Sequence, residues 1–403
     1  ESGIDDVLTS RWLGFPVMLA LLGGVFWITL AAANYPSALL ARILFHMEWW
    51  LSVAFRAAHA PDWLYGAAVL GAYRTMAWVV SVMLPPMAIF FPLFTLLEDL
   101  GYLARVSFNM DWCFKKCGAH GKQSLTMAMG FGCNAAGVMA CRIIDSPRER
   151  LVAILTNNFA PCNGRFPTLI ALASLIAAGS ITASLLVAAM VLLGVTAALG
   201  MSWALSRTVL RGVPSSFILE LPPYRMPQVA RVLWRSLYDR TLLVLRRALI
   251  VAAPAGAVVW ALANITTPAG ASILTSTAHT LQPAARVMGL DGFILTAFIL
   301  GLPANEIVLP ILLMAYSSST ALTETTGLAS LGRILAANGW TWLTALNTMI
   351  FSVLHFPCST TLLTIAAETK SARWTALAAL MPTALAIAAC CATRAAARLL
   401  GLA

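Results

Sequence analysis

Two short stretches decide the fold: Gly130-Phe131-Gly132-Cys133-Asn134 and His355-Phe356-Pro357-Cys358-Ser359-Thr360. Each interrupts an apolar segment of membrane length with glycine or proline, a cysteine and a small polar residue. Lipid offers the backbone no hydrogen-bond partners, so an interrupted segment at membrane depth persists only inside protein or beside a polar cavity. Duplicated interruptions of this kind are typical of a transporter that binds its substrate inside the membrane.

The composition places the chain in a lipid membrane. Of its 403 residues, 60% are hydrophobic and 10% are charged, and the mean hydropathy is +0.82, whereas soluble domains average about 25% charged residues. The net charge of +10 comes mostly from arginines between apolar segments, which indicates cytoplasmic loops and not nucleic-acid binding. The acidic start, Glu1 to Asp6, lacks an initiator methionine and is not a signal peptide. We therefore expect the membrane portion of a longer protein.

Runs of about 20 apolar residues predict an all-α fold, a polytopic transmembrane helical bundle with eight or nine crossings. Weak internal symmetry divides it into two repeats. The predicted parts are an N-terminal span and interfacial helix (residues 1–65), a first repeat (66–206), a cytoplasmic basic connector (207–247), and a second repeat with the C-terminal span (248–403).

Local composition predicts where helices are interrupted. Charged and aromatic residues alternate over Pro36–Ala60, which predicts a helix lying in the membrane interface. The pair Pro85-Pro86 predicts a kink or break within Gly66–Leu100. Further proline-containing breaks are expected within Leu151–Ala178 and Gly289–Tyr316.

Carboxylates among apolar residues mark the candidate substrate path. A charge at the membrane centre costs at least about 2.5–3.5 kcal/mol, and Glu306 has apolar residues on both sides. Glu98 ends an apolar run, so its alternative place is the membrane interface. In each half a glutamate precedes a cysteine: Glu98 precedes Cys133, and Glu306 precedes Cys358. We interpret these pairs as the repeated unit.

Thiol, amide, hydroxyl and carboxylate groups at such breaks can supply ligands for a divalent transition metal. Thiolate favours iron, zinc or copper over magnesium and calcium. The alternative for each cysteine is core packing, because a buried free thiol behaves as a small hydrophobe. The predicted metal-binding residues lie at or beside a break: Glu98, Cys133, Asn134, Cys162, Asn163, Glu306, Cys358 and Ser359.

Several ordered motifs resemble the membrane (permease) domain of FeoB, the ferrous-iron transporter family. The matching stretches span nearly the whole chain: Arg11–Pro16, Leu97–Arg105, Gly130–Arg142, Glu220–Arg225, Gly301–Val308 and Pro357-Cys358. The resemblance implies two gate-type repeats containing broken or re-entrant helices, like those of nucleoside carriers. It also implies import of Fe(II), with Mn(II) or Zn(II) as other cargo, through a multi-pass protein of the bacterial inner membrane.

One departure from the family concerns nucleotide binding. FeoB proteins have an N-terminal GTP-binding domain, but this sequence contains no Gly-x4-Gly-Lys-Ser/Thr loop. GTP would therefore act only through a GTPase domain that is absent from this chain, either removed or separate. We expect a transporter and not an enzyme, with no tightly bound cofactor. Besides lipid and the metal ion, the partners considered are that GTPase, a small accessory protein and further copies of the chain.

Two other functions stay open from the sequence. A carrier of nucleosides or other small organic solutes would use the same broken helices, but would need more hydrogen-bonding and aromatic groups than surround Cys133 and Cys358. A membrane scaffold without transport activity would not need a carboxylate such as Glu306 at membrane depth.

The basic excess of Arg207–Arg247 predicts that this stretch is cytoplasmic. A cysteine placed at Ser216 should react in intact cells with a membrane-permeant thiol reagent and not with an impermeant one. A cysteine placed at Thr267, in the uncharged stretch Thr266–Gln282 predicted on the opposite side, is the control. Labelling of Ser216→Cys from outside would invert the predicted topology.

Overall fold

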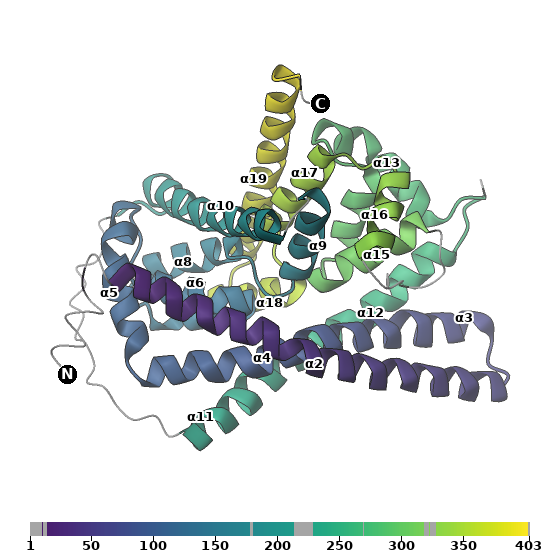
Figure 1. The fold of residues 1–403 in the computed structure, drawn as a ribbon, viewed down its shortest axis with the longest axis horizontal. Helices are drawn as coiled ribbons and strands as arrows, with labels where there is room; N and C mark the ends of the chain where they lie inside the picture. Colours follow the sequence, from purple (N-terminus) through teal and green to yellow (C-terminus); the bar gives the residue numbers. More distant parts are fainter. Residues whose placement is uncertain are drawn as a thin grey trace.

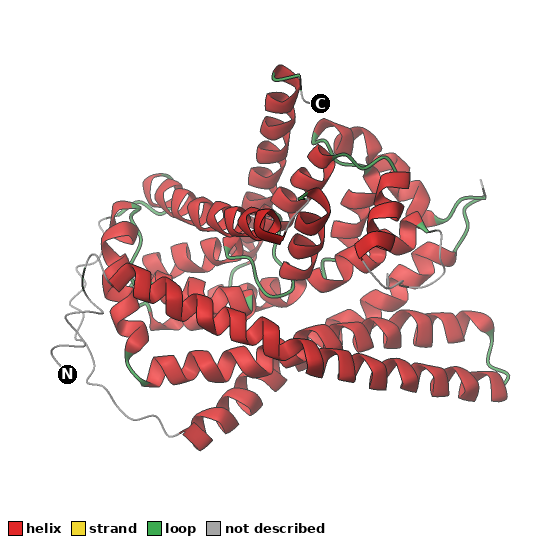
Figure 2. Ribbon diagram, viewed as in Figure 1, coloured by secondary structure: helices red, strands yellow, loops and turns green. Residues whose placement is uncertain are grey.

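The computed structural model describes residues 10, 14–177, 180–212, 229–268, 270–317, 322 and 328–401. Within these ranges the chain is helical with short connections (Figure 2), and the only β-type pairing is a single bridge between Thr266 and Ser272. The all-α prediction is confirmed. The motifs at Arg11–Pro16 and Glu220–Arg225 and the connector residues 213–228 lie wholly or largely outside the described residues.

The N-terminal part is a pair of long helical runs. Helix α2 (Gly14–Ala57) is one helix of 44 residues, and it packs against α4 (Figure 1). The second run consists of α3 (Asp62–Tyr65), η1 (Gly66–Tyr73) and α4 (Arg74–Asp99).

Two predictions about these helices are wrong. The interfacial helix expected over Pro36–Ala60 is not a separate element, because α2 runs through Pro36. Of the kink or break expected at Pro85-Pro86, the break is absent, because both prolines lie inside α4 and are buried. Each proline removes one hydrogen bond of the helix, a loss that packing against neighbouring helices tolerates in membrane proteins.

The first repeat continues through short helices to one long helix. Its elements are α5 (Tyr102–Lys116), α6 (Gln123–Gly132), α7 (Asn134–Ala140), η2 (Cys141–Ile143), α8 (Pro147–Thr156), η3 (Asn157–Phe159), α9 (Phe166–Ile176) and α10 (Ser180–Arg207). As the sequence predicts, α10 is uninterrupted, whereas α6–α7 and α8–α9 are interrupted helices.

The second repeat follows the same plan. Its elements are α11 (Val229–Arg235), η4 (Ser236–Leu242), α12 (Leu243–Asn264), α13 (Ile273–Val287), α14 (Gly292–Leu300), η5 (Asn305–Ile307), α15 (Val308–Tyr316), α16 (Leu328–Ala337), α17 (Trp342–Leu354), α18 (Ser359–Thr369) and α19 (Ala372–Leu399). Residues 229–247, expected in the polar connector, are instead helical and run into α12.

Six helices in the described ranges are long and apolar enough to cross a membrane, or seven if the α13–α14 pair, bent by 111°, counts as one span. The prediction of eight or nine crossings is therefore too high. The interruptions divide apolar segments into pieces such as Phe166–Ile176 and Asn305–Tyr316, which are too short to span alone.

A close helix crossing joins the η1–α4 run to α12. A Cβ on Gly71 would lie 2.9 Å from the carbonyl oxygen of Gly256, and a Cβ on Gly256 would lie 2.6 Å from the Cβ of Thr75. Only glycine allows this approach, as at other tight crossings of membrane helices. The crossing brings Met83 of α4 and Val244 of α12 to the same cavity.

Candidate functional site

The first break separates α6 from α7 at Cys133. Its backbone is extended there (φ −154°, ψ 124°), and α7 begins at the next residue, Asn134. Gly132 just before the break lies against the ring of Phe90, which a Cβ would overlap. The Gly-Phe-Gly-Cys-Asn sequence therefore supplies both the close approach of α4 and the change of direction.

The second break, between α8 and α9, crosses the first. Pro161 and Cys162 follow η3, and the backbone N–H of Asn163 donates to the carbonyl oxygen of Gly132 at 3.4 Å. The two interruptions of the first repeat thus satisfy part of each other's backbone hydrogen bonding, as lipid-embedded breaks require.

The second repeat contains an equivalent crossed pair. Ala304 is extended (φ −153°, ψ 124°) between α14 and η5, and Cys358 precedes α18. Ser359 donates through its backbone N–H to the carbonyl oxygen of Leu302 at 2.7 Å and through its hydroxyl to that of Pro303 at 3.2 Å.

This geometry corrects the predicted pairing of the repeats. The Cys133 break matches the Ala304 break, since both residues share the same backbone angles and are followed by asparagine. Pro161-Cys162 then matches Pro357-Cys358. Glu98 and Glu306 are not counterparts, because the residue that matches Glu306 in the first repeat is Ala135.

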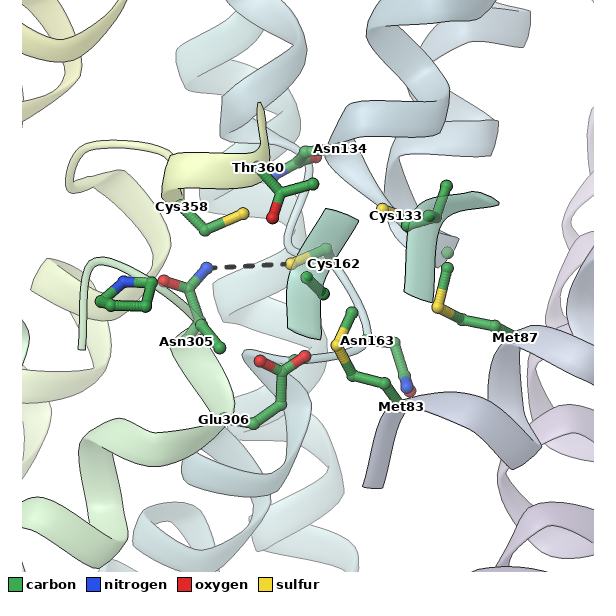
Figure 3. A pocket seen from close by; sticks show the side chains of 16 residues that line it. Met83, Met87, Cys133, Asn134, Cys162, Asn163, Asn305, Glu306, Cys358 and Thr360 are labelled. Carbon is green, nitrogen blue, oxygen red and sulfur yellow. Dashed lines mark hydrogen bonds between the residues drawn. The ribbon is translucent and has the colours of Figure 1, made fainter. Parts of the chain in front are cut away.

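The four breaks meet at one small cavity of about 30 Å³ (Figure 3). Its wall combines three thiols, one carboxylate, amides and two thioethers. The lining residues are Met83, Met87, Gly132, Cys133, Asn134, Cys162, Asn163, Gly164, Val244, Ala248, Pro303, Ala304, Asn305, Glu306, Cys358 and Thr360.

Glu306 contributes the only carboxylate among these lining residues. It is 9% exposed, and its carboxylate lies against Gly164, where a Cβ would be 2.6 Å from Cδ. The indole N–H of Trp78 on α4 donates to its backbone carbonyl at 3.3 Å. In the described residues no side chain donates a hydrogen bond to the carboxylate itself, so its oxygens are directed to the cavity.

The thiols approach from three different segments. Asn305 Nδ2 lies 4.0 Å from the sulfur of Cys162, the contact dashed in Figure 3. The sulfur of Cys358 lies 3.2 Å from Thr361 Oγ1. Cys133 is 8% exposed. The side-chain amide of Asn134 lies 3.1–3.2 Å from the carbonyl oxygens of Gly130, Asn157 and Ala160, so the amide nitrogen is the atom that fits there as a donor.

Six of the eight predicted residues line the cavity, and two do not. Glu98 lies exposed near the end of α4, which stops at Asp99 before Gly101 (φ 77°) turns the chain. The apolar run therefore ends there, and its carboxylate does not enter the cavity. Ser359 does not line the cavity, because its backbone N–H and its hydroxyl donate hydrogen bonds to the carbonyl oxygens of Leu302 and Pro303 in the opposite break.

The sequence interpretation missed three polar or sulfur-containing residues that line the cavity: Met83, Met87 and Asn305. Thr360, which the sequence placed at the Cys358 break but not among the metal-binding residues, also lines it. Matching Gly130–Asn134 with Gly301–Asn305 would have identified Asn305. The two methionines lie four residues apart on α4, but nothing in the sequence separates them from methionines that only pack.

The thiols and the carboxylate share a cavity without forming a closed coordination shell. In the part of the chain that the structure describes, no three histidine, cysteine, aspartate or glutamate side chains are close enough to hold a metal ion together. An ion held by the thiols and the carboxylate together would require these groups to lie closer to one another.

Comparison with known families gives two models in sequence order. The family described as "Gate: Nucleoside recognition" matches residues 80–176 and 245–372. The model described as "Ferrous iron transport protein B C terminus" matches residues 187–240, between the two. No solved structure matched the chain.

Relatives are proteins named Fe(2+) transporter FeoB. That of Staphylococcus aureus (strain MSSA476) is 29% identical over 398 residues, covering 95% of this chain and 57% of that protein. That of Methanocaldococcus jannaschii is 28% identical, covering 91% of this chain and 54% of that protein. A "Fe(2+) transport protein A/Fe(2+) transporter FeoB fusion protein" of Porphyromonas gingivalis is 25% identical, covering 92% of this chain and 48% of that protein.

The chain thus spans little more than half the length of the first relatives. Its two Gate matches fall on the two crossed pairs of breaks and together cover more than half of its length. The chain belongs to the Gate family and has the membrane-domain organisation of FeoB proteins.

Proposed function

We propose that the chain moves a divalent transition metal across the membrane through the cavity at the four breaks, and that Fe(II) is its main cargo. One observation supports this proposal above the others: three thiols and a buried carboxylate, from segments far apart in sequence, line a single cavity inside the helical bundle. The names of the relatives point to the same cargo.

The donor types suit a transition metal of intermediate softness. Thiolate and carboxylate together favour iron or zinc over magnesium and calcium, which prefer oxygen alone. Glu306 supplies charge, Cys133, Cys162 and Cys358 supply sulfur, and the amides of Asn134 and Asn163 supply supporting dipoles. Because lipid and protein exclude water around the cavity, a buried carboxylate is stabilised when a cation enters.

The size of the cavity argues against an organic solute. A volume of about 30 Å³ holds about two water molecules, since each needs roughly 10–15 Å³ in this measure. A nucleoside, with a base and a ribose ring, is much larger than this space, and a rearrangement that only brings the lining groups onto an ion would not admit it. The nucleoside-carrier alternative would also need stacking aromatic side chains, and none line this cavity.

Transport would proceed by rearrangement of the broken segments around the ion. Half-helices that meet at a central site can move as paired gates and expose the site to one side at a time. In the bacterial inner membrane such a cycle would import the ion. The part of FeoB relatives outside the matched region would supply the GTPase, and the fusion relative's name suggests an accessory partner.

Uptake by vesicles that contain the purified chain tests the function. We expect uptake of Fe(II), weaker uptake of Mn(II) and none of uridine. Glu306→Gln keeps the side-chain shape and removes the charge, so Fe(II) uptake should fall at least about tenfold if the loss of charge weakens the site by 1.4 kcal/mol or more, while thermal stability stays similar. Normal Fe(II) uptake by well-folded Glu306→Gln protein, or preferred uridine uptake, would reject the proposal.

A glycine substitution tests the position of the same carboxylate. In Gly164→Ala the new methyl would overlap the Glu306 carboxylate, so Fe(II) uptake should fall several-fold because the carboxylate is displaced. Gly200→Ala on α10 is the matched control, because its methyl would meet nothing within 4 Å. Equal uptake by the two alanine variants would show that the carboxylate position does not matter.

A further inference from the structure

Arg165 carries a charge in the interior without an ionic partner. It follows Cys162 by three residues, and its side chain is 1% exposed, although a buried charge is costly unless it is compensated. None of the ion pairs in the described residues includes Arg165. Something other than a carboxylate must stabilise its guanidinium.

The guanidinium group makes five contacts with uncharged oxygen atoms. Nη1 donates to the carbonyl oxygens of Asn158 at 2.9 Å and Val353 at 2.8 Å. Nη2 donates to Asn158 Oδ1 at 3.1 Å and lies 3.4 and 3.5 Å from the carbonyl oxygens of His355 and Phe356. One side chain of the first repeat thus holds the end of α17 and the first residues of the break that follows it in the second repeat.

These oxygens lie where two short helices end. Helix α17 stops at Leu354, and the α8–η3 run stops at Phe159. The last carbonyls of a helix have no partner within it, and together they present about half a negative charge. The guanidinium therefore lies where the negative ends of two half-helices meet, one from each repeat.

Transporters built from broken helices use unwound carbonyls and such helix ends to coordinate a coupling Na⁺ or H⁺. We propose that Arg165 is a permanent, built-in cation at this place, which locks the two repeats together and makes an exchangeable Na⁺ unnecessary there. The matching residue in the second repeat, three after Cys358, is the uncharged Thr361. One guanidinium therefore serves both helix ends.

The proposal has a consequence independent of the metal cargo. In Arg165→Met the charge is lost, and the oxygens of Asn158, Val353, His355 and Phe356 are left without the cation that they contact. Oxygen cages of this kind suit hard cations, so the variant should acquire a Na⁺ site that the unaltered chain lacks.

Thermal unfolding of the purified chain in detergent tests this. Melting temperatures are compared in sodium chloride and in choline chloride of equal ionic strength, for the unaltered chain, Arg165→Met and Arg165→Lys. Arg150→Met is the matched control, since Arg150 also donates to a backbone carbonyl, that of Ile144 at 2.9 Å, but away from these helix ends.

We expect Arg165→Met to melt lower in choline and to recover by about 2–4 °C or more in sodium, because Na⁺ would bind only the folded state. The unaltered chain, Arg165→Lys and Arg150→Met should melt alike in both salts. Equal melting of Arg165→Met in the two salts would overturn the proposal. If Arg165→Met does not fold, the Arg165→Lys variant tests the proposal instead. A stable lysine variant would support the need for a cation at this place, and an unfolded lysine variant would contradict it.

Discussion

The backbone groups set free where four helices are interrupted constrain the rest of this structure. Lipid cannot satisfy them, so each break must find its partners in another break. Asn163 donates to Gly132, and Ser359 donates to Leu302 and Pro303. Because each partner lies in the other interruption of the same repeat, the breaks can exist only as crossed pairs. Arg165 then joins one pair to the other through the carbonyl groups beside Pro357.

The chemistry of the cavity follows from that crossing. Each repeat places the cysteine of its second break in the wall of the cavity, at Cys162 and Cys358. The first pair of matching breaks differs between repeats: Cys133 stands where the second repeat has Ala304, and Glu306 stands where the first repeat has Ala135. The two repeats therefore form a similar framework with an asymmetric set of polar and sulfur-containing groups, in which Glu306 is the one carboxylate among the residues that line the cavity.

The breaks themselves could be predicted because their signal is local. Glycine or proline beside a cysteine and a small polar residue, within an apolar run, identified the interruptions at Cys133, Cys162 and Cys358. Gly301 and Pro303, with no cysteine beside them, identified the interruption before Glu306. Features that depend on packing could not be predicted in this way. Pro36 lies within a continuous α2 although its ring removes one backbone hydrogen bond, and nothing in the local sequence indicates that the helix continues.

The same limit applies to the site. Glu98 and Glu306 look alike in sequence, since both adjoin apolar runs, but only the second is enclosed by another repeat. Met83 and Met87 reach the cavity through the close crossing of η1–α4 with α12 at Gly71 and Gly256, which local sequence does not reveal. The predicted pairing of Glu98 with Glu306 was wrong because the pairing follows from the matching backbone at Cys133 and Ala304, which only the structure shows.

X-ray absorption at the iron K-edge, on the purified chain loaded with Fe(II) without oxygen, tests the central claim most directly. Ions held at the crossing of the breaks should have both sulfur and oxygen neighbours, from the thiols and from Glu306. A coordination shell of oxygen and nitrogen alone would place the ion elsewhere and contradict the account.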